Sequence, residues 1–254
     1  MSYFNNLYRS FLNWGGDVKK LNAFPYVTWD TTTHKIDFDE ILAALPLVEY
    51  GDIGLHREVG YLSNSVIPGF MKHGWIHVED DPSSPKIVEA VSEGVIYRNA
   101  IYPLFSDYAM ILSPKNVTEE ERAGACKKAK SLVGADYDVN FKFDIEKELH
   151  FYSGKDKVSA SSDLKVSSDN LKKYVPTFSC TEVVGYSWWH KREELGLFRT
   201  ECNGKNVLKP DMFVNTDWKI KWMSSSITLD IAKKLGLHEE GLYLIEDYLC
   251  NVKK

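Results

Sequence analysis

The sequence predicts an α+β domain with extra helices at both ends, and two kinds of pattern support this fold class. Runs rich in β-branched and aromatic residues, bounded by turn formers, are typical of short strands. Apolar residues at helical spacing, preceded by capping residues, are typical of helices. The 254 residues, 44% of them hydrophobic, suffice for one large domain with additional elements. The expected strands lie at residues 53–55, 73–79, 86–90, 94–97, 108–112 and 218–223.

Helices are expected between and around these strands. Residues 118–134 fit a helix capped by Thr118, with glutamates in the first turn and Gly134 at its end. A short helix broken by Pro46 is expected within residues 38–50. Residues 3–12 and 224–253 also carry apolar residues at helical spacing, which predicts further helices near the two ends.

Charge and cysteine content exclude several classes of protein. The net charge of −5 argues against non-specific binding to nucleic acids and gives no attraction to anionic membranes. The cysteines are widely spaced without a CxxC pair, so we expect neither a zinc motif nor a disulfide framework, and a reducing compartment fits. No apolar run approaches the roughly 18 residues of a transmembrane helix, and the N-terminus lacks a signal-peptide pattern.

The stretch at residues 51–80 holds the first candidate site residue. On the expected strand, His73, Trp75 and His77 share one face, while Gly74 and Ile76 face the other way. Such a polar face lines either a site or a solvated surface. Two alternatives stay open for His73: a hydrogen-bonded structural histidine, or a metal ligand paired with His77 at a spacing better suited to a helix.

Cys180 is the second candidate. It precedes a run with helical spacing, and Glu182 in the first turn suits the helix dipole. A thiol at a helix N-terminus has a lowered pKa, and the free backbone N–H groups there can bind an oxyanion. With an imidazole added, the parts for thiol-based acyl transfer are present. The alternative is that Cys180 is an inert, buried packing residue.

Three segments together resemble the circularly permuted papain-like hydrolases of the NlpC/YiiX type. They are GDIGLHREVGYLSNSVIPGFMKHGWIHVED, KIVEAVSEGV and FSCTEVVGYSWW, and the segment 207–212 resembles the apolar-x-Pro-Asp sequence that follows in such proteins. The resemblance covers residues 48–189. It implies an antiparallel sheet or half-barrel packed on helices. It also implies Cys180 as nucleophile, His73 as base and Glu89 as the group that orients the imidazole.

Other residues keep two interpretations. Without the resemblance, Glu89 would equally suit an ordinary edge-strand carboxylate, and Glu79 is the next candidate for its role. Tyr137 either lines the substrate site or is a plain core tyrosine. Cys126 is expected to pack inside a helix.

The resemblance implies a cysteine peptidase or amidase that needs no metal or other cofactor. Its substrate would be a peptidoglycan stem peptide or another small peptide or acyl amide. The same family includes lipid-directed deacylases and acyltransferases, so an ester or acyl chain is an alternative. A different class remains open as well: a non-catalytic structural module assembled into a larger particle, such as a virion. The absence of an export signal fits a cytoplasmic or virion-associated location.

The expected domain organisation has three parts. Residues 1–50 form an N-terminal extension that packs on the body, residues 51–223 form the hydrolase domain, and residues 224–254 form a C-terminal helical extension. An insertion at about 150–177, rich in Ser, Lys and Asp, interrupts the family pattern before Cys180. It is expected to be a surface loop, serving either as a lid or as a solvated insertion without function.

Overall fold

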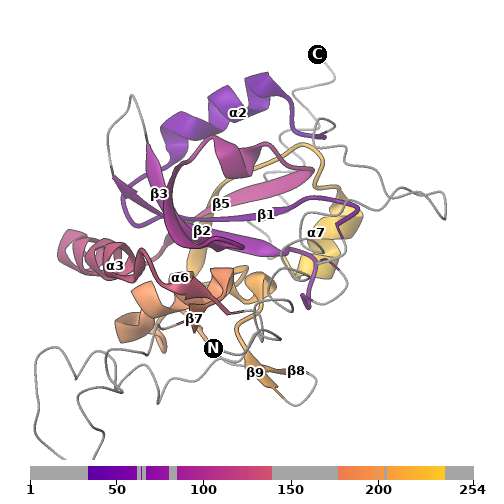
Figure 1. Cartoon of the computed structure of the whole chain (residues 1–254). Coiled ribbons are helices and arrows are strands. Elements are labelled where there is room, and N and C mark those ends of the chain that lie inside the picture. The colour runs from indigo at the N-terminus through magenta and orange to yellow at the C-terminus, as the bar shows by residue number, and fades with distance from the viewer. Residues whose placement is uncertain are drawn as a thin grey trace, which may run out of the picture.

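A computed structural model of the chain describes residues 34–61, 64, 67–79, 85–138, 177–198, 200–202 and 205–237 (Figure 1). The helix expected at residues 3–12 and nearly all of the expected insertion lie outside the described residues. The same holds for the C-terminal extension beyond residue 237. The remaining expectations can be compared with the structure.

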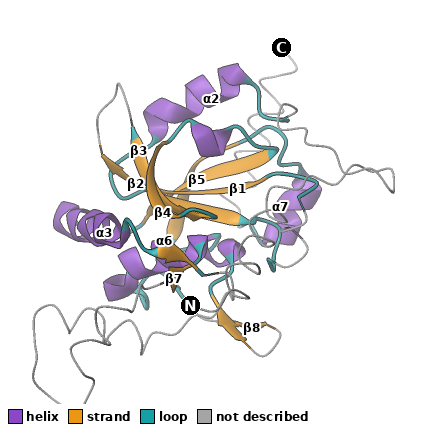
Figure 2. Cartoon of the chain, in the orientation of Figure 1, coloured by secondary structure: helices purple, strands orange, loops and turns teal. Residues whose placement is uncertain are grey.

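An antiparallel six-stranded sheet with helices packed on it forms the centre of the molecule, so the α+β class is confirmed (Figure 2). The strand order is β10-β5-β1-β2-β3-β4. Each strand predicted from the sequence is present. Their bounds are β1 Ile53–Arg57, β2 His73–Glu79, β3 Lys86–Val91, β4 Gly94–Asn99, β5 Tyr108–Pro114 and β10 Trp218–Met223.

Helices cover both faces of this sheet. Helix α2 (Phe38–Ala44) lies on one face, where Ile41 joins a buried cluster with Trp75 and Ile111 of the sheet. Helices α3 (Glu119–Leu132) and α6 (Cys180–Ser187) lie on the opposite face, above the larger apolar core (Figure 1). The larger core includes Ile53, Leu55, Ile76, Val88, Leu112, Ala129, Val183 and Val184.

This layering argues against one of the two alternatives left open for β2. The face shared by His73, Trp75 and His77 is not solvated, because Trp75 and His77 are each only 1% exposed. Only His73, at the start of the strand, keeps appreciable exposure, with 18% of its side chain accessible. His73 is therefore the one of these three side chains that solvent can reach, and a site that uses them would lie at the His73 end of β2.

Capping residues explain where the helices begin. The Thr118 side chain accepts from the Glu121 backbone N–H at 3.2 Å, and the Glu121 carboxylate accepts from the Thr118 N–H at 2.7 Å. This reciprocal pair confirms the predicted start of α3. Helix α2 is capped by Asp37 in the same way and passes into the 3₁₀ turn η1 (Leu45–Leu47), which contains Pro46 as expected. No helix in these described ranges is both long enough and apolar enough to cross a membrane.

Smaller elements complete the described chain. Helix α7 (Leu229–Leu235) is the described part of the expected C-terminal helices. The remaining elements are η3 Tyr102–Leu104, β6 Asp136–Tyr137, β7 Thr177–Phe178, η4 Trp189–Lys191, β8 Thr200–Cys202, β9 Lys205–Val207 and η5 Pro210–Phe213.

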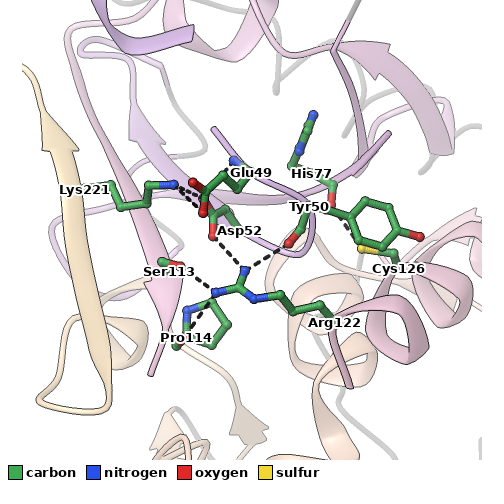
Figure 3. A network of polar contacts seen from close by, with 9 residues as sticks. All are labelled: Glu49, Tyr50, Asp52, His77, Ser113, Pro114, Arg122, Cys126 and Lys221. Carbon is green, nitrogen blue, oxygen red and sulfur yellow. Dashed lines mark hydrogen bonds and ion pairs between the residues drawn. The ribbon is translucent and has the colours of Figure 1, made fainter. Parts of the chain in front are cut away.

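Asp52 anchors the start of β1 to two distant elements (Figure 3). Its side chain is fully buried, and its two oxygens accept from Arg122 Nη1 of α3 and Lys221 Nζ of β10, each at 3.1 Å. Arg122 also donates to the Tyr50 carbonyl at 2.9 Å and to Ser113 Oγ at 2.9 Å. Buried charges are tolerated only when they are paired and hydrogen-bonded in this way. Asp52 therefore has a structural role. Its two 3.1 Å ion pairs join the start of β1 to α3 and β10, and Arg122 extends the network to Ser113 of β5 at 2.9 Å.

We expect Gly54→Ala to destabilise the fold by about 3 kcal/mol or more, since overpacking a dense core costs 1–3 kcal/mol and occasionally more. Gly54 lies opposite Trp75 in the sheet, and a Cβ there would lie 1.9 Å from Trp75 Cζ2. Urea unfolding measures the change. Gly124→Ala is the matched control: a Cβ there meets nothing within 4 Å, so it should stabilise the exposed helix position by up to about 1 kcal/mol. Equal effects of the two changes would contradict the packing argument.

Candidate functional site

The structure brings His73 and Glu89 together across two neighbouring strands. His73 is the first residue of β2, and Glu89 pairs in register with Trp75, two residues further along β2 and on the same face. His73 Nε2 donates to Glu89 Oε2 at 2.9 Å. The carboxylate is almost completely buried, at 1% exposure. Glu89 thus occupies the position from which a carboxylate can fix the orientation and tautomer of an imidazole.

Cys180 reaches this pair from α6. It is the first residue of the helix, after Ser179, and its Sγ donates to the Lys72 carbonyl at 3.8 Å, one residue before His73. Cys180 also lies close enough to His73 to raise the pKa of the imidazole. Because Glu89 occupies Nε2, the remaining ring nitrogen, Nδ1, is the one available to the thiol.

The packing of α6 on β2 explains this approach. A Cβ at Gly74 would lie 3.5 Å from Val184 Cγ2 and 3.8 Å from Thr181 Cγ2, so the first turns of α6 cross directly over the start of β2. The Glu182 carboxylate accepts from the Ser179 N–H at 2.6 Å and fixes where the helix begins. Cys180 therefore lies in the first turn, where backbone N–H groups have no partner within the helix.

The charges of the site favour an ionised imidazole. Burial works to lower the pKa of His73, but the adjacent Cys180 and Glu89 outweigh it and raise that pKa to about 10. Burial works to raise the pKa of Glu89, but the hydrogen bond from His73 and the nearby positive charges lower it to about 2. At neutral pH the site therefore holds a carboxylate and an imidazolium, the partner that stabilises a thiolate.

Arg98 is a neighbour of the site that the sequence analysis did not identify. Its Nη1 donates to Glu89 Oε1 at 3.0 Å, so the carboxylate bridges Arg98 and His73. The Arg98 guanidinium also lies over the Tyr102 ring, 5.0 Å from its centroid. The sequence carries no local signal for this contact, because it depends on the register of β3 against β4.

His56 is the second unpredicted neighbour. It lies directly opposite His73 in the β1–β2 register, and the two ring centroids are 4.6 Å apart. Burial, with the charge of His73 close by, lowers the pKa of His56 to about 3. His56 is therefore neutral at neutral pH, which leaves His73 as the charged member of the pair.

We expect His56→Phe to make the fold less sensitive to acid. The pKa of His56 is about 3 when folded and 6.5 when free, so the unfolded chain binds more protons as the pH falls below 6.5. Stability due to neutral His56 is present above pH 6.5 and is lost toward pH 3. Between pH 7 and pH 4 the wild type should lose about 2–3 kcal/mol more than His56→Phe, at 1.4 kcal/mol per pH unit. Urea unfolding at both pH values measures this, and parallel losses would contradict it.

Tyr137 lies beside the start of α6. Its strand β6 runs parallel to β7, which leads through Ser179 into Cys180, and Tyr137 pairs with Phe178. Burial raises the pKa of Tyr137 well above its usual value, and the nearby Cys180 and Glu182 raise it further. Because its pKa is raised, Tyr137 is a neutral phenol at neutral pH.

His77 and Glu79 lie away from this cluster. The His77 carbonyl accepts from Cys126 Sγ at 3.3 Å, and the His77 N–H donates to the Asp52 carbonyl at 2.8 Å (Figure 3). Glu79, at the far end of β2, pairs with Lys86 at 3.2 Å and Lys130 at 3.8 Å. Among the described residues, no group of three or more His, Cys, Asp or Glu side chains is placed to hold a metal ion.

Comparison of the chain with protein-family models, with curated proteins and with solved structures gave no match. The functional argument therefore depends on the chemistry of the site. A thiol, an imidazole and a carboxylate are the side chains that thiol-based acyl transfer uses as nucleophile, proton carrier and orienting group.

Proposed function

We propose that the protein is a cysteine hydrolase of the permuted papain-like type, which cleaves an amide bond with Cys180 as nucleophile. One observation carries the proposal: Cys180, at the start of α6, places its Sγ 3.8 Å from the carbonyl of Lys72, directly before His73, and the Nε2 of the His73 ring is held by buried Glu89. The order of these residues along the chain also matches the resemblance noted in the sequence. If Cys180 were an inert packing residue, the fold would not need a charged imidazole beside it.

The proposed reaction has two stages. The Cys180 thiolate attacks the substrate carbonyl, and the backbone N–H of Cys180 stabilises the oxyanion. His73 then gives its proton to the leaving amine as the C–N bond breaks, which leaves an acyl thioester. In the second stage His73 takes a proton from water, the hydroxide attacks the thioester, and the thiolate is released with the carboxylic acid product.

The substrate class follows from the resemblance, which favours a peptidoglycan stem peptide or another small acyl amide. A lipid-directed deacylase or acyltransferase would use the same thiol chemistry on an ester. A turnover assay with a stem peptide, an acyl amide and a phospholipid ester as parallel substrates distinguishes these substrate classes. Turnover of the ester alone would reassign the substrate, and turnover of none would favour a non-catalytic module.

Thiol labelling tests the proposed nucleophile directly. Iodoacetamide at pH 6.5 should modify Cys180 at least about tenfold faster than Cys126, because reactivity follows thiolate character. Cys126 is an internal control, since it is also buried and its thiol donates to the His77 carbonyl at 3.3 Å. Peptide mass spectrometry measures both rates. Equal labelling, or labelling of Cys180 only after unfolding, would contradict the proposal.

A further inference from the structure

Asp211 fixes the segment that leads into His73. It lies in η5, remote in sequence, and its two carboxylate oxygens accept from consecutive backbone N–H groups of that segment. The Phe70 N–H donates to Oδ2 at 2.6 Å, and the Met71 N–H donates to Oδ1 at 2.7 Å. Hydrogen bonds to a charged acceptor are short and about twice as strong as neutral ones. Asp211 therefore holds both amides immediately before Lys72 and His73.

Gly69 makes this contact possible. Its φ of +96° lies in the region that favours glycine, and a Cβ there would lie 2.6 Å from Asp211 Oδ2. Two further contacts hold the segment: Arg57 Nη1 donates to the Phe70 carbonyl at 3.2 Å, and the Lys72 N–H donates to the His56 carbonyl at 3.1 Å. Asp211 on one side, and Arg57 and His56 of β1 on the other, thus fix the path of the chain into β2.

The segment also carries the contact made by the thiol. The Lys72 carbonyl accepts from Cys180 Sγ at 3.8 Å, and His73 is the next residue. A shift at Phe70 and Met71 would therefore move both the carbonyl beside the thiol and the imidazole. A displacement of about 1 Å in such a site can reduce the rate on the order of 10²-fold.

We propose that Asp211 is a positioning residue that sets the distance between Cys180 and His73 by clamping the Phe70 and Met71 amides. This inference rests on the proposed function. Asp211 makes no described contact with Cys180 or His73 themselves, so it acts through the backbone it holds.

The test compares Asp211→Asn with Asp107→Asn. Asn retains one carbonyl oxygen but presents an N–H₂ group to the second amide, so one hydrogen bond is lost. Asp107 is the matched control, because its Oδ2 accepts from the Val59 N–H at 2.5 Å, at the other end of the same β1–β2 connection. We expect Asp211→Asn to lower kcat on the order of 10²-fold with little change in KM. It should also raise the pH at which Cys180 reacts with iodoacetamide.

The outcomes separate the two proposals. If wild-type Cys180 shows no enhanced reactivity, the proposed function fails. If wild-type Cys180 is reactive but Asp211→Asn leaves its pH profile unchanged, only the positioning role is overturned. Equal effects of Asp107→Asn and Asp211→Asn would also overturn it, because they would indicate general loosening of the connection. Asp211→Glu, which keeps two acceptors, should recover part of the lost reactivity, and thermal melts confirm that each variant is folded.

Discussion

Cys180→Ala should abolish turnover, lowering kcat by about 10⁴-fold or more, as removal of the nucleophile does in enzymes that work through an acyl intermediate. The same change should alter the free energy of unfolding by no more than about 1 kcal/mol, because it removes one sulfur atom. Steady-state kinetics on the preferred substrate and urea unfolding measure the two effects. His73→Ala should lower kcat by a similar factor, since thiol and imidazole act as one unit.

Cys126→Ala is the matched control for this experiment. Cys126 is fully buried in α3 and bonds to the His77 carbonyl, at the other end of β2 from the site. Its loss should leave kcat unchanged and lower stability by about 1 kcal/mol. Residual turnover in Cys180→Ala at wild-type levels would place the chemistry elsewhere.

Asp52→Ala should lower the free energy of unfolding by about 3–5 kcal/mol, the usual cost of removing one partner from a buried ion pair. Arg122 and Lys221 are only 12% and 14% exposed in their side chains, and each would lose its buried partner. The Glu49 N–H would also lose its acceptor at 2.9 Å. Urea unfolding at pH 7 measures the change.

Glu49→Ala provides the control for Asp52→Ala. Glu49 pairs with the same Lys221 at 2.9 Å, but its side chain is 69% exposed. An exposed ion pair contributes only about 0–1 kcal/mol, so the loss should be several times smaller. If the two variants lost equal stability, burial would not be what makes the Asp52 contacts important.

The parts of the fold that the sequence predicted are those determined by local chemistry. Thr118 and Glu121 mark the start of α3 through their own backbone groups, and Pro46 falls where α2 gives way to a 3₁₀ turn. The strand order and the parallel pairing of β6 with β7 could not be predicted this way, because they join residues far apart in the chain. The burial of Trp75 and His77 could not be predicted for the same reason.

In the candidate site, too, residues with a local sequence signal could be predicted and residues placed by strand register could not. Cys180 and His73 could be proposed because each has a local signal, a helix start and a polar strand face, and the resemblance linked them with Glu89. Arg98 and His56 could not, since their contacts with Glu89 and His73 follow from the register of β3 with β4 and of β1 with β2. The role of Asp211 likewise depends on η5 returning to the start of β2.

The parallel pair of β6 and β7 bears on how this protein can change over evolution. Asp136 lies beside Thr177 and Tyr137 beside Phe178, so two points far apart in the sequence are neighbours in space. Doubling the length of a connecting loop costs only about 0.6 kcal/mol of closure entropy, while a parallel crossover needs about a dozen residues at minimum. A change in the number of residues between Tyr137 and Thr177 should therefore cost little stability, as long as β6 and β7 still pair and β7 leads into Cys180. Insertions and deletions between these two strands would then leave the start of α6 in place, because the β6–β7 pairing sets its position.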